Sequence, residues 1–153
     1  MQRTLIFMTL AIALVLTSAS SFAAVDRNEF GLGFVIGEPT GLNAQFFWNK
    51  NTAVDFTAAW SMGDWMMLAG DYQIYNYIGD APREWRWYYG LGAFLKFPED
   101  EDLKLGFRVP LGVKYHFPYS IIDIWAEIAP GIELIDDTNA ILHGGLGLTL
   151  WLK

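Results

Sequence analysis

Several residue types and patterns are missing from this chain of 153 residues, and each absence removes a class of protein. Cysteine is absent, which excludes a disulfide framework and any metal site built on thiolates. The formal net charge is -7, and an acidic chain is a poor partner for nucleic acid. Low-complexity linkers and long runs of charge are lacking as well, so the length indicates a single domain.

Long hydrophobic runs are also scarce, and the one at the start of the chain has the pattern of a signal peptide. Arg3 precedes a mostly apolar stretch from Leu5 to Leu16, and small residues stand at Ser21 and Ala23. We expect cleavage after Ala23, which leaves 24–153 as one mature domain. A retained membrane helix is the alternative, but the apolar stretch is shorter than the roughly 20 residues that a span needs. Because no later run is long enough for a helix, the mature chain can enter a membrane only as a closed barrel.

The rest of the chain alternates between apolar and polar residues, which is typical of β-strands. In the stretch 103–117 every second residue from Leu103 to Phe117 is apolar or aromatic, whereas the intervening residues are basic, small or polar. Turn signals divide the chain into about eight such segments with short connections and no helical pattern between them, which predicts an antiparallel meander. The segments are 30–36, 42–48, 53–60, 65–75, 85–97, 103–117, 121–134 and 141–152.

The two faces of these strands could be arranged in two ways. A soluble barrel or a two-sheet sandwich would bury the apolar face, whereas a membrane barrel turns it toward lipid. The apolar face is large and unbroken in the last four segments, and the opposite face is rich in glycine and holds nearly all the strand charges. Small residues suit the narrow lumen of an eight-stranded barrel. We therefore predict an all-β fold, an eight-stranded antiparallel up-and-down transmembrane β-barrel.

Aromatic residues gather where the predicted strands end, as they do in the two girdles of a membrane barrel. One predicted rim carries Trp60 and Phe97. The other, on the side of the chain termini, carries Phe30, Trp48, Tyr72, Trp85, Trp87, Tyr115 and Phe117.

The polar face predicts a network of charges inside the lumen, because an unpaired charge away from water is costly. Assuming a tight turn at Pro118 and Tyr119, Lys114 lies opposite Asp123, Lys104 lies opposite Glu133, and Arg108 reaches Glu127 diagonally. The network could be an ion path, but a neutralised plug is the favoured interpretation. Its predicted members are Asp55, Asp71, Arg86, Lys104, Arg108, Lys114, Asp123, Glu127 and Glu133.

Two prolines, Pro110 and Pro130, fall inside predicted strands. Proline cannot donate to the hydrogen-bond ladder, and a closed barrel has no edge at which to place it. We expect a β-bulge at or beside each of them.

Three stretches together resemble a family of small bacterial outer-membrane β-barrel proteins: GLGFVIGEPTGLNAQFFWNKNTAVDFTAAWS, FRVPLGVKYHFP and EIAPGIEL. Gly37, Pro39, Thr40 and Gly41 match the turn of that family's first hairpin. The family is similar to the eight-stranded membrane domain of the outer-membrane protein A and X type. One departure is that such barrels usually end on an outward aromatic residue, whereas Trp151 here falls in the lumen register.

The resemblance implies a bacterial outer-membrane location and no catalytic residues. It also implies contact with outer-membrane lipid and lipopolysaccharide, and with the barrel-assembly machinery during insertion.

The favoured function is a non-enzymatic, monomeric outer-membrane barrel with a structural or envelope role, a filled lumen and no cofactor. A narrow pore is one alternative. A lipid-modifying enzyme is another, in which His143 would meet Ser61 and Asp64, with His116 at the opposite end. The predicted outer loops are too short for much of a binding face. Their acidic residues at 99–102 and 136–137 are interpreted as solvated rather than metal-binding.

Overall fold

The computed structural model describes residues 30–61, 65–98, 102–134 and 138–152, and the expected signal peptide lies outside these ranges. Within them the secondary structure is nine β-strands, and no helix there is long and apolar enough to cross a membrane. The strands are β1 (Phe30–Glu38), β2 (Thr40–Asn49), β3 (Thr52–Trp60), β4 (Trp65–Tyr77), β5 (Trp85–Pro98), β6 (Lys104–Arg108), β7 (Leu111–His116), β8 (Ile122–Glu133) and β9 (Asn139–Leu152).

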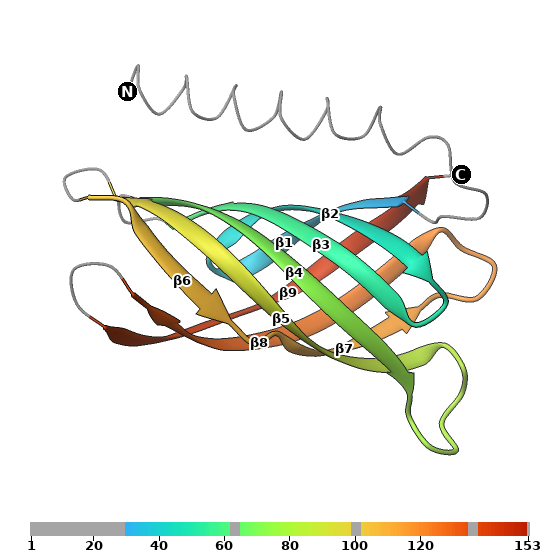
Figure 1. The fold of residues 1–153 in the computed structure, drawn as a ribbon. Coiled ribbons are helices and arrows are strands. Elements are labelled where there is room, and N and C mark those ends of the chain that lie inside the picture. Colours follow the sequence, from blue (N-terminus) through green and yellow to red (C-terminus); the bar gives the residue numbers. More distant parts are fainter. Residues whose placement is uncertain (1–29, 62–64, 99–101, 135–137, 153) are drawn as a thin grey trace.

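The strands form a closed antiparallel ring (Figure 1). Apart from β6 and β7, each strand pairs with the next along the chain, and β1 pairs with β9 from Phe30 opposite Leu152 to Glu38 opposite Gly144. Every described strand therefore has a neighbour on both sides, and no ladder of N–H and C=O groups is left open. The predicted up-and-down β-barrel is confirmed.

β6 and β7 together occupy one position in the ring, because both pair with β5 on one side and β8 on the other. The nine strands thus fill eight positions, as the sequence predicts. The interruption falls at Val109 and Pro110, where the ladder lacks the proline N–H.

The expected β-bulges at the two prolines are absent, and that prediction was wrong. On β8, Arg108 lies opposite Gly131 and Leu111 opposite Ile128, so the register is unchanged across Pro110. The β8–β9 register is likewise unbroken through Pro130. Each proline keeps its carbonyl in the ladder: the Gly90 N–H donates to Pro110 O and the Val109 N–H donates to Pro130 O, both at 2.9 Å. Each proline therefore removes one hydrogen bond from the ladder, and no extra residue has to be inserted as a bulge.

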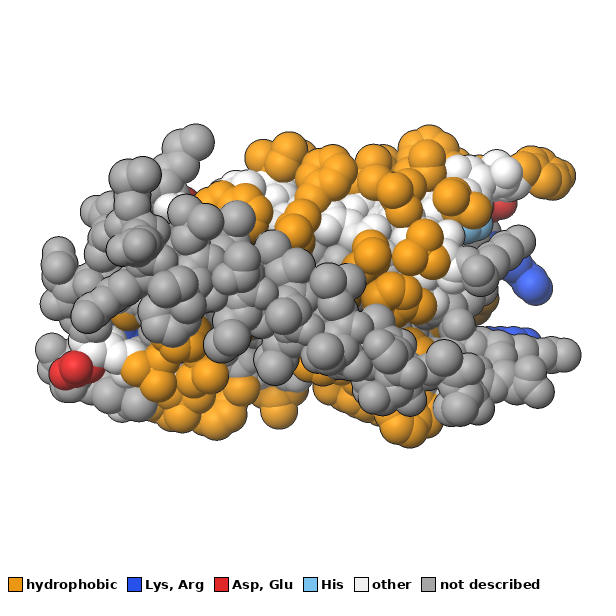
Figure 2. All heavy atoms as spheres, turned by 90° about the horizontal axis from the view of Figure 1, so that it is seen from above, with side chains coloured by type: hydrophobic (Ala, Val, Ile, Leu, Met, Phe, Trp, Pro, Cys, Tyr) orange, Lys and Arg blue, Asp and Glu red, His pale blue; other side chains and the backbone are white. Residues whose placement is uncertain are grey.

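The two faces of the ring differ as the alternation predicts. The outward face carries exposed apolar side chains, and Figure 2 shows them over the part of one side that the grey residues leave visible. The inward face holds the buried polar and charged side chains. This distribution is the inverse of that in a water-soluble protein. The buried polar residues are Asn43, Gln45, Asp55, Thr57, Asp71, Gln73, Arg108, Lys114, Asp123, Glu133, His143 and Thr149.

The barrel has two distinguishable ends (Figure 1). We call the end where β1 begins and β9 finishes the terminal end; the β2–β3, β4–β5 and β7–β8 turns lie there too. The opposite end is called the loop end. Outward aromatic rings pack together near the terminal end, with centroid distances of 4.9 Å for Trp85 and Tyr115 and 5.0 Å for Tyr115 and Phe117.

Candidate functional site

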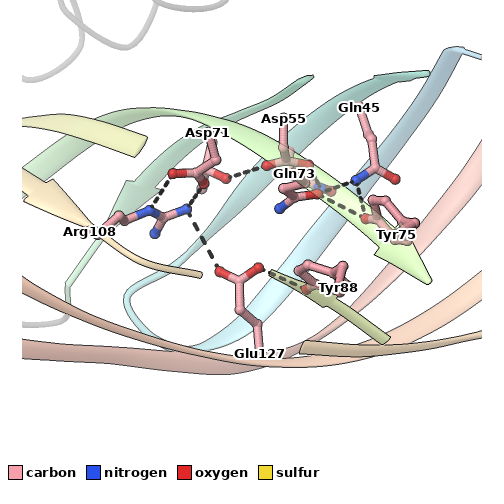
Figure 3. A network of polar contacts seen from close by, with 10 residues as sticks. Gln45, Asp55, Asp71, Gln73, Tyr75, Tyr88, Arg108 and Glu127 are labelled. Atoms are coloured by element: carbon pink, nitrogen blue, oxygen red, sulfur yellow. Dashed lines mark hydrogen bonds and ion pairs between the residues drawn. The ribbon is translucent and has the colours of Figure 1, made fainter. Parts of the chain in front are cut away.

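The centre of the lumen is an ion-pair cluster of three residues from three strands. Arg108 on β6 donates from Nε to Asp71 Oδ1 on β4 at 2.9 Å and from Nη2 to Asp71 Oδ2. Its Nη2 also lies 3.8 Å from Glu127 Oε1 on β8. Figure 3 shows the guanidinium between the two carboxylates. Only 5% of the Arg108 side chain is exposed, so this two-point pairing is shielded from water.

Asp55 lies next to this cluster and is hydrogen-bonded to neutral donors. It lies directly opposite Asp71 on the neighbouring strand. Its carboxylate accepts hydrogen bonds from Asn43 Nδ2 at 2.9 Å and from Thr57 Oγ1 at 3.1 Å. The predicted entry of Asp55 into the lumen network is therefore seen as a hydrogen-bonded link rather than an ion pair.

A second polar network lies between the centre and the terminal end. Lys114 Nζ donates to Gln45 Oε1, and Gln45 Nε2 donates to Gln73 Oε1 at 2.9 Å and to Tyr75 OH at 2.8 Å. The Lys114 ammonium also lies 5.3 Å and 5.4 Å from the ring centroids of Tyr75 and Trp151. The positive charge is thus enclosed by amide oxygen and aromatic faces.

Lys114 also has a carboxylate partner. Its Nζ lies 3.8 Å from Asp123 Oδ2, and the other Asp123 oxygen lies 2.6 Å from His116 Nδ1. Towards the central cluster, the Tyr88 hydroxyl donates to Glu127 Oε2 at 2.8 Å. Ion pairs and hydrogen bonds therefore follow one another along the lumen.

Apolar and aromatic side chains fill the lumen on both sides of the central ion-pair cluster, which was not predicted from the sequence. The terminal cluster consists of Phe47, Ala53, Tyr75, Tyr88 and Trp151. The loop cluster consists of Ala59, Met67, Ala69 and Phe94, with Trp65 and Ile141 packed against it. The lumen is thus blocked by packed side chains near each end.

A signal for this filling is present in the sequence as glycines opposite inward aromatic residues. Tyr88 pairs with Gly112 across β5 and β7, and Phe94 pairs with Gly106 across β5 and β6. A Cβ atom on Gly112 or Gly106 would overlap the opposite ring. Each ring therefore occupies the space that its glycine leaves free, as in aromatic rescue of glycine in designed sheets.

The structure brings together most of the predicted network, with two of its three predicted contacts present and a further pair between Arg108 and Asp71. Asp71, Arg108 and Glu127 meet at the centre, and Lys114 contacts Asp123. The predicted register between these strands was off by two residues, since Lys114 lies opposite Trp125. The reason is the turn: Phe117 N–H donates to Ile122 O, so the turn spans 118–121 rather than Pro118 and Tyr119 alone.

The same shift makes the predicted pairing of Lys104 with Glu133 wrong. Gly106 lies opposite Glu133, and Lys104 lies opposite Lys96 on β5. Glu133 instead accepts a hydrogen bond from Lys96 Nζ at 3.1 Å. Arg86, the remaining predicted member, lies at the terminal end, away from the central cluster.

The two histidines lie at opposite ends, as predicted, in different surroundings. The buried His143 ring has its centroid 5.4 Å from that of Phe94 and 6.4 Å from that of Trp65, and its Nδ1 has no hydrogen-bond partner. The His116 side chain is half exposed. Asp64, the proposed acidic partner of His143, lies outside the described residues.

One small cavity lies beside the central cluster. Its volume is about 20 Å³, and its polar lining comes from Thr57, Arg108, Glu127 and His143. A space of this size holds about one water molecule. In the described part of the chain no group of three or more His, Asp or Glu residues is placed to hold a metal ion. The acidic stretches 99–102 and 136–137 lie almost entirely outside that part.

Comparison with known proteins identifies a solved structure with the same fold. No family model and no curated protein matches the sequence. A solved structure does match: the N-terminal β-barrel domain of Pseudomonas aeruginosa OprF. The two chains share one fold. The TM-score is 0.60, with 82% of this chain and 96% of that domain covered. Sequence identity is 13%, so the likeness concerns the fold, and it agrees with the resemblance to eight-stranded barrels of the outer-membrane protein A type.

Proposed function

We propose that this protein is an integral outer-membrane β-barrel with a structural role in the cell envelope. The observation that carries the proposal is the inverted distribution of side chains on a ring without edges. Exposed apolar residues cover the outside, while buried charges and amides line the inside. Lipid favours this arrangement, because it solvates apolar side chains and cannot satisfy an open strand edge. Outer-membrane lipid and lipopolysaccharide are the partners that fit such a surface, and the barrel-assembly machinery would insert it.

The content of the lumen favours a structural role over transport or catalysis. The Arg108–Asp71 pair stands at the centre, and apolar clusters stand on either side of it. An ion would have to displace packed aromatic rings and break buried pairs. His143 is enclosed by aromatic rings, an unsuitable setting for attack on a lipid at the membrane surface.

Cell fractionation tests the location. The mature protein is expected in the outer-membrane fraction as a monomer that only detergent releases. As a control, the same preparation without detergent should leave it in the pellet. Recovery of folded protein from a detergent-free periplasmic extract would overturn the proposal.

Single-channel recording tests the closed lumen against the narrow pore. The cavity beside Arg108 and Glu127 is the feature that favours a pore. Refolded wild-type protein in a planar bilayer is expected to show little conductance, and Arg108→Ala should increase leakage by removing the central pair. Steady wild-type conductance, with only ion selectivity altered in Arg108→Ala, would instead establish the pore.

A further inference from the structure

The terminal end of the lumen contains an arginine that is held between two aromatic rings. Arg86 on β5 lies opposite Tyr77 on β4, and its Nη2 donates to the Tyr77 hydroxyl at 3.1 Å. The guanidinium carbon lies 4.9 Å from the centroid of the Tyr77 ring and 5.9 Å from that of Phe47. Stacking and the hydrogen bond fix the plane of the guanidinium while most of its N–H groups remain available.

Arg86 differs from three other inward cations in having no acidic partner among the described residues. Arg108, Lys114 and Lys96 each contact a carboxylate, whereas no carboxylate of the described residues lies within ion-pair distance of Arg86. The residue opposite it on β7 is another cation, Lys114. An arginine that is half-buried, oriented and unpaired provides a ready site for an anion.

Two further cations reinforce the positive charge at this place. Arg83 lies in the β4–β5 turn and Lys50 in the β2–β3 turn, both at the terminal end of the barrel where Arg86 lies. Asp80 and Glu84 lie in the same β4–β5 turn, yet neither forms an ion pair with Arg83 or Arg86 in the described part of the chain. The three cations therefore come from two neighbouring turns and one strand end.

The terminal cluster lies directly behind this group. Arg86 contacts Phe47, whose ring centroid lies 4.9 Å from that of Tyr75, and Tyr75 in turn stacks on Tyr88 at 4.8 Å. A ligand that reaches Arg86 from the aqueous side would thus meet packed rings and stop there. The geometry suits binding at this end rather than passage through the barrel.

We propose that the terminal end of the barrel binds an oxoanion, a phosphate or a carboxylate group, with Arg86 as its main ligand and Arg83 and Lys50 as supporting charges. The planar guanidinium matches two oxygens of such a group, and charge-assisted hydrogen bonds give it strength. Oxoanion binding at the terminal end is a property in addition to the structural role, because a purely structural barrel does not need a ligand site.

The test uses the full mature chain refolded in zwitterionic detergent micelles, with inorganic phosphate as the probe. Saturable chemical-shift changes are expected at the Arg86 guanidinium and the Tyr77 ring. Arg86→Gln should weaken phosphate binding about tenfold or more, because a charged hydrogen-bonding partner is lost. Arg86→Lys should restore only part of the affinity, because the charge returns without the planar fork.

Matched variants separate a specific site from general attraction of phosphate to any cation of the barrel. Tyr77→Phe keeps every charge but releases the guanidinium, and a several-fold loss of affinity is expected even if Arg86→Gln fails to fold. Lys96→Gln removes a cation at the loop end and should leave phosphate binding unchanged. Equal weakening by Lys96→Gln, or unchanged binding in Tyr77→Phe and Arg86→Gln, would overturn the proposal.

A second experiment distinguishes a lipid headgroup from a soluble anion as the source of the oxoanion. Nanodiscs of phosphatidylglycerol and of phosphatidylcholine are compared in phosphate-free buffer, and inorganic phosphate is then added to each. Perturbation of the Arg86 and Tyr77 signals only in the anionic discs would identify a lipid headgroup as the ligand. Perturbation by free phosphate in both disc types would identify a soluble ligand. Binding is measured from the side-chain signals of Arg86 and Tyr77. A negative result would therefore refute the oxoanion site without affecting the proposed location or the closed lumen.

Discussion

At the scale of single residues, two inward glycines of this barrel are each matched to an aromatic ring on the neighbouring strand. Gly112 lies under Tyr88 and Gly106 under Phe94. A glycine inside a strand normally weakens it, because it packs no side chain and costs backbone entropy. At these two positions the ring of Tyr88 or Phe94 supplies the packing that the glycine lacks. The glycine is therefore required because the ring needs the space and not because of its backbone conformation.

Adding a methyl group at Gly112 tests this relation. Gly112→Ala should force the Tyr88 ring from its position and lower the free energy of unfolding by about 1–3 kcal/mol, the usual cost of overpacking. The measurement is reversible denaturant unfolding in lipid vesicles, followed by tryptophan fluorescence. Gly70→Ala is the control, because its Cβ would meet its nearest neighbour, Phe56, at an ordinary 3.4 Å. Equal stability of both variants would contradict the account.

The central ion pair gives a second test at the same scale. Arg108→Met or Asp71→Asn alone should cost about 3–5 kcal/mol, because each leaves one buried charge unpaired. The double variant should cost clearly less than the sum of the two. A cycle with Glu127→Gln should show weaker coupling, because Glu127 lies 3.8 Å from the guanidinium whereas Asp71 binds it at two points. Additive costs for Arg108 and Asp71 in the unfolding assay would refute the pairing.

At the scale of strands, the position shared by β6 and β7 is the weakest part of the ladder. Pro110 has no N–H for β5, and Pro130 has none for β6. The two missing donors fall on adjacent rungs, since Val109 N–H donates to Pro130 O and Gly90 N–H to Pro110 O. Local opening should therefore need less free energy here than elsewhere in the ring.

Amide hydrogen exchange in micelles measures that difference. The amides of Val109 and Gly90 should exchange faster than those of Phe107 and Val113, which lie on either side of the interruption. Pro130→Ala restores a donor toward Val109 O and should slow exchange at Val109. Uniform protection along β5, β6 and β7 in the wild type would show that the missing donors do not weaken the ladder.

The same strands show what sequence patterns can and cannot predict. Alternation located the strands and their faces, because the period of two residues is set by the backbone itself. It could not fix the residues directly opposite Lys114 and Lys104, although the predicted contact of Lys114 with Asp123 is present. Register depends on the turn, and the turn at 118–121 is two residues longer than the one assumed at Pro118 and Tyr119. The prediction of bulges at the prolines was wrong because the loss of an N–H donor removes a hydrogen bond but does not change how many residues pair on each strand.

A filled lumen was predicted, but the aromatic and apolar clusters inside it could not be, for a different reason. Alternation shows that Tyr88 and Phe94 point inward, but not whether rings from different strands meet or leave a channel. That outcome depends on how strands distant in sequence are placed around the ring, as for Phe47 with Trp151. The contacts of Lys114 with Asp123 and of Arg108 with Glu127 could be predicted, because complementary charges occur on neighbouring strands. The contact of Arg108 with Asp71 could not, because it joins strands that lie on either side of β5.

At the scale of the whole molecule, stability depends on the apolar outer surface matching its surroundings. Leu111 is exposed on the outward face near the middle of its strand position. Leu111→Arg should cost about 2–4 kcal/mol if lipid surrounds it near the bilayer midplane. The assay is reversible unfolding in vesicles. Tyr119→Arg, at the fully exposed tip of a turn, is the control and should have little effect. A silent Leu111→Arg would mean that this face does not meet lipid.

The seam between β1 and β9 has a consequence for how the chain assembles. Its rungs join Phe30 to Leu152 and Glu38 to Gly144, the most widely separated strands in the sequence. Until that zipper closes, one side of β1 and one side of β9 have no partner, and lipid offers them none. Hairpins formed earlier cannot rest in the bilayer as stable intermediates, so closure must be cooperative and late. Contacts of such long sequence separation also make folding slow. Assembly is therefore most easily disrupted in the period before closure, when the free edges of β1 and β9 must be protected from pairing with other chains.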